Sequence, residues 1–144
     1  MTGDVLDLSI AGYEFDATTL GADAEWDANW LVVAGEVTTA GETWTFRNPC
    51  LTTWEARELL EFLREAKVDA SVEFTEPNLS FHVTEATDDT VTVGACLRAE
   101  AAAATATHDV RWGSGTSVWF RVSRGGLDEA ATAWAAELEC FPQR

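Results

Sequence analysis

The chain has 144 residues, a formal net charge of −16 and an apolar share of 47%. That length is typical of one domain with a core of its own, so we expect residues 1–144 to form a single domain. A surface this negative repels phosphate, which argues against direct binding to nucleic acid or to membranes and favours a basic partner.

The cysteines and the start of the chain indicate its compartment. Cys50, Cys96 and Cys140 are odd in number and lie far apart, without the paired spacing of a zinc site. The chain does not open with the basic and then apolar stretch of a signal peptide, and no apolar run approaches the ~18 residues of a membrane span. We therefore expect a cytoplasmic protein without a metal or cofactor.

The first third of the chain predicts strands on either side of an acidic loop. Leu6, Leu8 and Ile10 alternate with polar residues, which is the period of a half-buried strand. Residues 16–28 are acidic and contain one aromatic side chain, Trp26, so we expect an exposed loop there. The next two strands should form a hairpin over residues 29–37 and 42–47, with a turn at 39–41.

Residues 44–55 predict a strand that passes into a helix. Pro49 has no N–H to donate, so we expect strand pairing to end there. Thr52 and Glu55 have the Thr-x-x-Glu spacing of a capping box, in which hydroxyl and carboxylate each accept a backbone N–H. A helix should therefore begin at Thr53 and continue to about residue 66. Its apolar stripe consists of Ala56, Leu59, Leu60 and Leu63.

The remaining chain predicts a meander, a loop, a last strand and a second helix. The alternating segments are residues 71–75, 79–84, 90–98 and 118–122. Residues 100–107 are mostly alanine, without a large side chain to anchor a helix, so we expect a long loop. We expect Gly125 and Gly126 to separate the last strand from a helix over about residues 128–141. This order indicates an α+β fold, a mostly antiparallel sheet of about six to eight strands with two α-helices packed on it.

Few residues are candidates for catalysis. His82 lies in an alternating strand and is interpreted as a surface residue, and His108 lies beside Asp109 without an activated serine or cysteine nearby in sequence. Cys50 precedes a predicted helix N-terminus, where the helix dipole could lower a thiol pKa, but a buried and inert cysteine is the favoured interpretation. The sequence favours binding over catalysis, and we expect no enzyme.

Four segments carry a resemblance to a known family. They are Asp27-Ala-Asn-Trp-Leu-Val-Val, Gly35-Glu-Val, residues 44–56 and Phe74-Thr-Glu-Pro-Asn-Leu-Ser-Phe. In this order they resemble the WapI-type immunity proteins of bacterial polymorphic toxin systems, and the likeness extends to the tail, while residues 96–117 depart from the family pattern. The resemblance implies a cytoplasmic protein that neutralises the C-terminal toxin domain of a cell-wall-associated protein, in the known case a nuclease acting on tRNA.

The leading hypothesis joins this resemblance to the distribution of charge. Residues 1–46 carry nine Asp or Glu and neither Lys nor Arg. An acidic protein can occupy the basic cleft of a nuclease toxin as a mimic of phosphate, with exposed acids that speed encounter and a tryptophan that anchors the complex. The predicted contact residues are Asp16, Asp23, Glu25, Trp26 and Asp27.

Two alternatives stay open. The chain could be a non-catalytic ligand- or peptide-binding scaffold whose aromatic residues line a groove and whose acidity is an adaptation to a salty cytoplasm. That alternative predicts a strong rise in stability with molar salt. An enzyme that used Cys50 or His108 would instead show a reactive Cys50 thiol.

Overall fold

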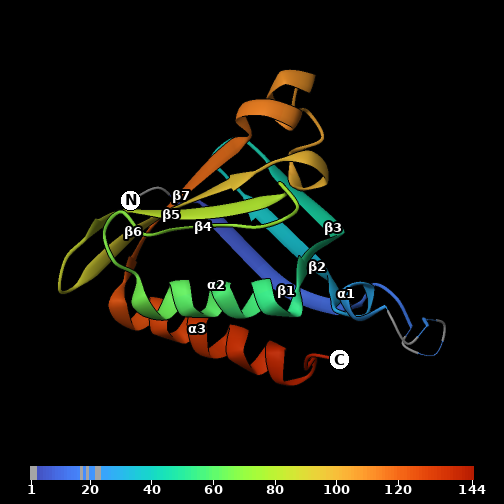
Figure 1. Cartoon of the computed structure of the whole chain (residues 1–144). Helices are drawn as coiled ribbons and strands as arrows, with labels where there is room; N and C mark the ends of the chain where they lie inside the picture. Colours follow the sequence, from blue (N-terminus) through green and yellow to red (C-terminus); the bar gives the residue numbers. More distant parts are fainter. Residues whose placement is uncertain (1–2, 17, 19, 22–23) are drawn as a thin grey trace.

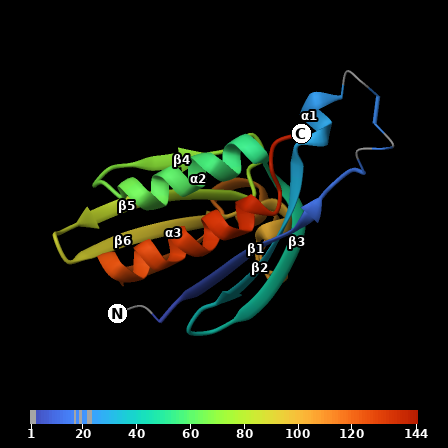
Figure 2. The same ribbon diagram turned by 90° about the horizontal axis from the view of Figure 1, so that it is seen from below.

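The computed structural model describes residues 3–16, 18, 20–21 and 24–144. Within these residues seven strands form two antiparallel sheets, and three α-helices accompany them (Figures 1 and 2). The strands are β1 (Val5–Tyr13), β2 (Trp30–Thr38), β3 (Thr43–Thr52), β4 (Ser71–Glu73), β5 (Leu79–Ala86), β6 (Thr90–Leu97) and β7 (Thr116–Ser123). The helices are α1 (Glu25–Ala28), α2 (Thr53–Glu65) and α3 (Arg124–Glu139). The predicted α+β class is confirmed.

The strands divide into two sheets where the sequence predicted one. The first sheet has the order β1-β2-β3, and the second, in which the predicted meander is confirmed, has the order β4-β5-β6-β7. Between them α2 follows β3 directly and carries the chain from one sheet to the other. Because β1 and β7 each pair with one strand only, each leaves one edge of its sheet open.

Strand β3 is longer than predicted, because Pro49 does not end it. Pro49 pairs with Val32, next to a register shift between Leu31 and Val32, and β3 continues to Thr52. Since β3 lies at the edge of its sheet, a residue without an N–H is tolerated there. The expectation that pairing ends at Pro49 is therefore wrong.

The predicted capping box at the start of α2 is present. The Thr52 hydroxyl accepts the N–H of Glu55 at 3.2 Å, and the Glu55 carboxylate accepts the N–H of Thr52 at 3.0 Å. The other carboxylate oxygen accepts the N–H of Thr75 at 2.6 Å. The helix begins at Thr53, as predicted. Of the predicted apolar stripe, it buries Ala56, Leu59 and Leu60.

Helix α3 begins four residues before the predicted start. The Ser123 hydroxyl accepts the N–H of Gly126 at 3.0 Å and caps the helix, so both glycines lie in its first turn. Further along, the Trp134 indole donates to the main-chain oxygen of Ala56 at 2.8 Å. This buried hydrogen bond holds α3 against α2, and the two helices lie side by side beneath the sheets (Figures 1 and 2).

The core lies where the two sheets and the two long helices meet. It takes apolar side chains from every one of these layers, and Phe62 of α2 lies 6.2 Å from Phe81 of β5 between ring centroids. Its most deeply buried members include Leu31, Leu51, Leu59, Leu79, Leu97 and Val118. Of the helices in the described part of the chain, none is long and apolar enough to cross a lipid bilayer.

The Ala-rich segment, predicted as a long loop, begins with a buried 3-10 turn, η2 (Ala99–Ala101). The Trp44 indole of β3 donates to the main-chain oxygen of Ala101 at 2.9 Å. The Arg111 guanidinium donates to the main-chain oxygens of Ala99 and Ala103 at 2.7 and 2.8 Å. Small side chains let this backbone approach β3, and the prediction of a loop did not include this burial. Residues 104–107 lie outside helices and strands.

Candidate functional site

Three tryptophans from three elements meet beside α1. The Trp26 ring stacks on Trp54 of α2 with centroids 5.8 Å apart, and it meets Trp30 of β2 edge-on at 5.7 Å. Trp30 is buried, whereas Trp26 is 50% exposed. The two other rings thus hold the Trp26 side chain in one position, while half of its large apolar surface stays exposed to solvent.

Carboxylates surround this cluster. Glu25 and Asp27 flank Trp26 on α1, and both are exposed. Glu14, just after β1, has a raised pKa, first because burial penalises its charge and then because Asp27 and Glu76 are near. Two acidic groups from other parts of the chain therefore repel the Glu14 carboxylate here. We call this surface the acidic tryptophan patch; it consists of Glu14, Glu25, Trp26, Asp27, Trp54 and Glu76.

The buried side chain of Asn29 fixes the patch to the body of the protein. Its oxygen accepts the Thr53 hydroxyl at 2.8 Å and the N–H of Arg144 at 3.0 Å. Its amide group donates to the main-chain oxygens of Glu25 and Arg144 at 2.7 and 3.1 Å. Since these bonds reach α1, α2 and the end of the chain, Asn29 sets the position of Trp26 relative to Trp54.

The end of the chain brings a cation to the border of the patch. The Arg144 guanidinium lies 3.7 Å from the centroid of the Tyr13 ring and donates to the main-chain oxygen of Phe15 at 3.0 Å. The carboxylate of Asp16 accepts hydrogen bonds from Thr18, which lower its pKa, and Arg144 lowers it further. Although the first 46 residues contain no Lys or Arg, the fold places the Arg144 guanidinium next to them.

The structure brings together part of the predicted contact set. Glu25, Trp26 and Asp27 lie on α1, a helical turn where the sequence predicted only loop, and Trp26 is exposed as predicted. Asp16 lies on the exposed segment after β1, and Asp23 lies outside the described residues.

Sequence reasoning missed three members of the patch. Glu14 and Glu76 carry no local signal, because only the fold brings Glu76 and Asp27 close to Glu14. Trp54 does carry a local signal, because it lies one position after the predicted start of α2 and does not belong to the apolar stripe of that helix. A large apolar residue off the stripe of an amphipathic helix indicates a contact other than the core.

The candidate catalytic residues do not form a site. Cys50 is buried, and burial, together with Glu100 and Glu76, raises the pKa of its thiol to about 12, which is the opposite of the lowering considered from the sequence. His82 is half-buried, with its ring edge-on to Trp119 at 5.1 Å. His108 is exposed. In the described part of the chain, no group of three or more His, Cys, Asp or Glu side chains is placed to hold a metal ion.

A family model matches almost the whole chain. It is the model of the Immunity protein WapI-like family, and the match covers residues 1–142. Neither a curated protein nor a solved structure matches the chain. The matched range includes every described strand and helix, so the resemblance carried by four segments of the sequence is confirmed.

Proposed function

The chain belongs to the Immunity protein WapI-like family, and from this premise we propose that it neutralises a basic nuclease toxin by covering the active site with the acidic tryptophan patch. The family supports an immunity function and a cognate toxin as partner. The observation that carries the choice of surface is Trp26, half exposed, braced by Trp54 and surrounded by carboxylates.

The patch has the electrostatic form that a nuclease cleft recognises. A nuclease holds the RNA backbone with Lys and Arg side chains, and carboxylates can take the place of the phosphates. In the free protein Asp27 and Glu76 each repel the Glu14 carboxylate, and this repulsion adds to the effect of burial in raising the pKa of Glu14. Cations of the toxin would relieve this repulsion, so complex formation gains free energy at the patch itself.

Trp26 supplies the anchor that charge alone does not. Tryptophan is enriched among the few interface residues that dominate binding energy, especially where it is rigid before the partner arrives. The stacking on Trp54 and the hydrogen bonds of Asn29 provide this rigidity. The protein would act by binding alone, since its buried Cys50 offers no reactive thiolate.

The test is binding and protection with the toxin domain encoded by the neighbouring reading frame. Wild-type protein should bind this domain and rescue cells that express it. Trp26→Ala should weaken the affinity at least tenfold, whereas Trp112→Ala, which removes a similarly exposed tryptophan elsewhere, should leave it within about twofold.

The outcomes separate the function from the surface. Wild-type protein that neither binds nor protects would refute the immunity function towards this toxin. If Trp26→Ala still binds the toxin domain and Trp112→Ala does not, the contact surface lies around Trp112 and not at the patch.

A further inference from the structure

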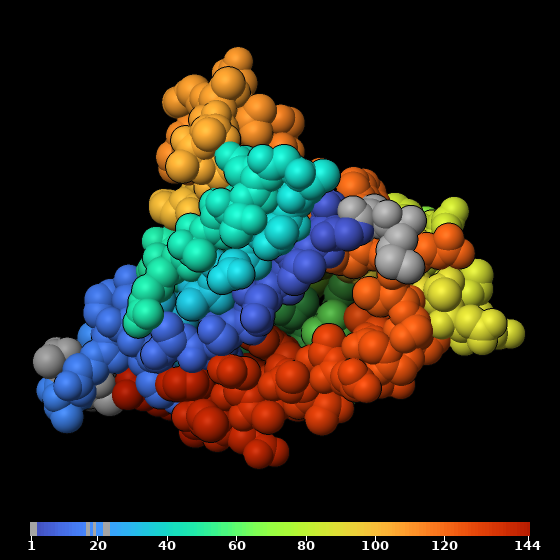
Figure 3. Space-filling view, turned by 180° about the vertical axis from the view of Figure 1, so that it is seen from behind, coloured from blue at the N-terminus to red at the C-terminus, as the bar shows by residue number. Residues whose placement is uncertain are grey.

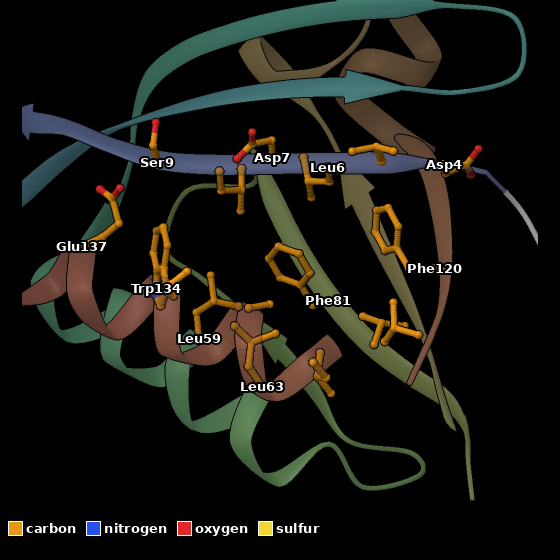
Figure 4. A pocket seen from close by; sticks show the side chains of 17 residues that line it. Asp4, Leu6, Asp7, Ser9, Leu59, Leu63, Phe81, Phe120, Trp134 and Glu137 are labelled. Carbon is orange, nitrogen blue, oxygen red and sulfur yellow. The ribbon is translucent and has the colours of Figure 1, made fainter. Parts of the chain in front are cut away.

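A groove of about 490 Å³ lies between the two sheets, at the other end of β1 from the acidic tryptophan patch. Figure 3 shows the hollow between β1, in blue, and α3, in orange and red, with atoms of the middle of the chain visible inside it. Apolar side chains from α2, α3 and the second sheet point into it, as Figure 4 shows for Leu59, Leu63, Phe81 and Trp134. The proposed function makes no use of this groove.

One edge strand of each sheet, β1 and β7, lines this groove. β1 pairs only with β2, and β7 pairs only with β6. The N–H of Ile10 donates to the Glu137 carboxylate of α3 at 3.0 Å, and the N–H of Trp119 donates to the Asp4 carboxylate at 3.1 Å. Both amides therefore point away from their own sheets, and side-chain carboxylates are their partners there.

The regular part of β1 offers further main-chain groups. Alternate residues of a strand direct their N–H and C=O groups to the same side, so Leu6 and Leu8 share the open side with Ile10. The pairing of β1 with β2 is regular from Val5 to Ile10, and the register shift comes only after Ile10. One side of the groove is thus formed by the regular edge of β1 from Val5 to Ile10. These six residues span about 20 Å.

The rim of the groove is acidic. Asp4, Asp7 and Glu137 are the charged residues among those that line it, and no Lys, Arg or His is among them. Figure 4 shows Asp7 and Ser9 along β1 and Glu137 opposite on α3. An occupant that pairs with this edge thus meets apolar side chains on one of its faces and carboxylates at the rim.

We propose that this groove receives an extended, apolar and basic segment of the cognate toxin domain, which pairs with β1 as an added strand. The inference rests on the proposed function, since that function supplies the partner. Main-chain hydrogen bonds to Leu6 and Leu8 would give affinity, and alternate side chains of the segment would give specificity. The apolar ones would contact Leu63 and Trp134, and the basic ones Asp7.

Strand addition fits the groove better than two other occupants. A small molecule would fill the volume but would leave the N–H and C=O groups of β1 without partners. A second copy of the chain would bring the same carboxylates against the rim, so Asp4 and Asp7 would repel their counterparts. Because β1 leads from the groove to Glu14, one toxin domain can contact both surfaces.

The test uses the toxin domain of the neighbouring reading frame, purified as a catalytically inactive variant. Ala133→Arg places a bulky cation in the groove, while Ala136→Arg places the same side chain on α3 at a position that does not line it; both alanines are exposed. Ala133→Arg should weaken binding at least tenfold and Ala136→Arg less than twofold. In the wild-type complex, hydrogen exchange at the amides of Leu6 and Leu8 should slow at least tenfold.

The outcomes distinguish the two proposals. If wild-type protein does not bind the toxin domain, the proposed function fails and the inference with it. If wild-type protein binds, Ala133→Arg binds as well and the two amides are not protected, the inference alone is overturned. The inference is also overturned if these amides are protected in the free protein and the protection grows with protein concentration. That result would show that a second copy of the chain pairs with this edge.

Discussion

The Thr53 hydroxyl donates a hydrogen bond of 2.8 Å to the side-chain oxygen of Asn29, and this bond joins the first turn of α2 to the residue that ends α1. Asn29 is fully buried, and the same oxygen also accepts the N–H of Arg144. One side chain therefore holds a helix start, a helix end and the chain terminus together. The geometry of the acidic tryptophan patch depends on it.

Replacing this side chain tests that dependence. Asn29→Ala should lower the free energy of unfolding by about 2–4 kcal/mol, because it leaves the buried Thr53 hydroxyl and main-chain groups without their partner. Chemical denaturation followed by tryptophan fluorescence measures the change. Asn48→Ala, a half-buried asparagine on β3, is the control and should cost less than about 0.5 kcal/mol. Equal denaturation midpoints for Asn29→Ala and wild type would contradict the role of Asn29.

The Ala-rich segment should loosen when its hydrogen bond to Trp44 is lost. Trp44→Phe keeps an aromatic ring in the core but leaves the buried main-chain oxygen of Ala101 without its donor, at a cost of about 1–2 kcal/mol. Hydrogen exchange at the amides of Ala101 and Ala102 should accelerate. Trp112→Phe, on the exposed surface, should change neither quantity, and an unchanged exchange rate in Trp44→Phe would show that other contacts hold the segment.

The three thiols should differ in reactivity. Cys140 is exposed, whereas Cys50 and Cys96 are buried, so a thiol reagent at pH 8 should modify one cysteine in the native protein and three in denaturant. Mass spectrometry of the modified protein should assign the native reaction to Cys140. Fast modification of Cys50 in the native state would reopen the possibility of a nucleophilic role.

The same burial makes stability fall in strong base. The folded protein keeps Cys50 protonated up to a pKa of about 12, while the unfolded chain ionises it near the ordinary value of 9.0. The unfolded state therefore loses its proton first, and the stabilisation, complete below pH 9, declines as pH rises towards 12. Cys50→Ser, whose hydroxyl does not titrate in this range, should show a smaller decline in the denaturation midpoint between pH 9 and 11.

Neutralising one carboxylate of the patch should stabilise the free protein. The pKa of Glu14 is raised, so the folded state disfavours its ionised form, and this penalty appears as pH rises through the raised value. At pH 7, Glu14→Gln should therefore gain roughly 0.2–0.5 kcal/mol after solvent screening, and at a pH well below 4 the gain should vanish. Glu85→Gln, an exposed acid on β5, is the control.

Salt separates patch repulsion from a general adaptation to salt. In 1 M KCl the difference between Glu14→Gln and wild type should shrink, because the Debye length is then about 3 Å and salt screens the repulsion from Asp27 and Glu76, while the penalty from burial remains. A wild-type midpoint that rises strongly with molar salt, in a protein for which no basic partner is found, would favour the scaffold alternative over charge mimicry.

Local signals predicted local structure. The hydroxyl and carboxylate of the capping box lie three residues apart, so the start of α2 at Thr53 was readable from Thr52 and Glu55 alone. The alternation of Leu6, Leu8 and Ile10 likewise predicted β1. In both cases the interaction that decides the structure lies within a few residues, and the sequence displays it.

What the sequence could not predict depends on distant partners. Pro49 is tolerated because β3 is an edge strand, and the strand order that makes it so is not a local property. Ala101 is buried because the indole of Trp44 reaches it across 57 positions in sequence. The sequence predicts that Trp26 is exposed, but the stacking of Trp54 on Trp26 and the approach of Glu76 to Glu14 require the fold.

Pro49 also bears on how the protein behaves at high concentration. The first sheet has two outer edges, and the one formed by β3 contains a residue that cannot donate a hydrogen bond to an incoming strand. The other edge, formed by β1, carries Asp4 and Asp7 close by, so identical molecules that meet there repel each other. Both edges of the first sheet thus resist edge-to-edge aggregation, and the protein should stay dispersed when it is concentrated.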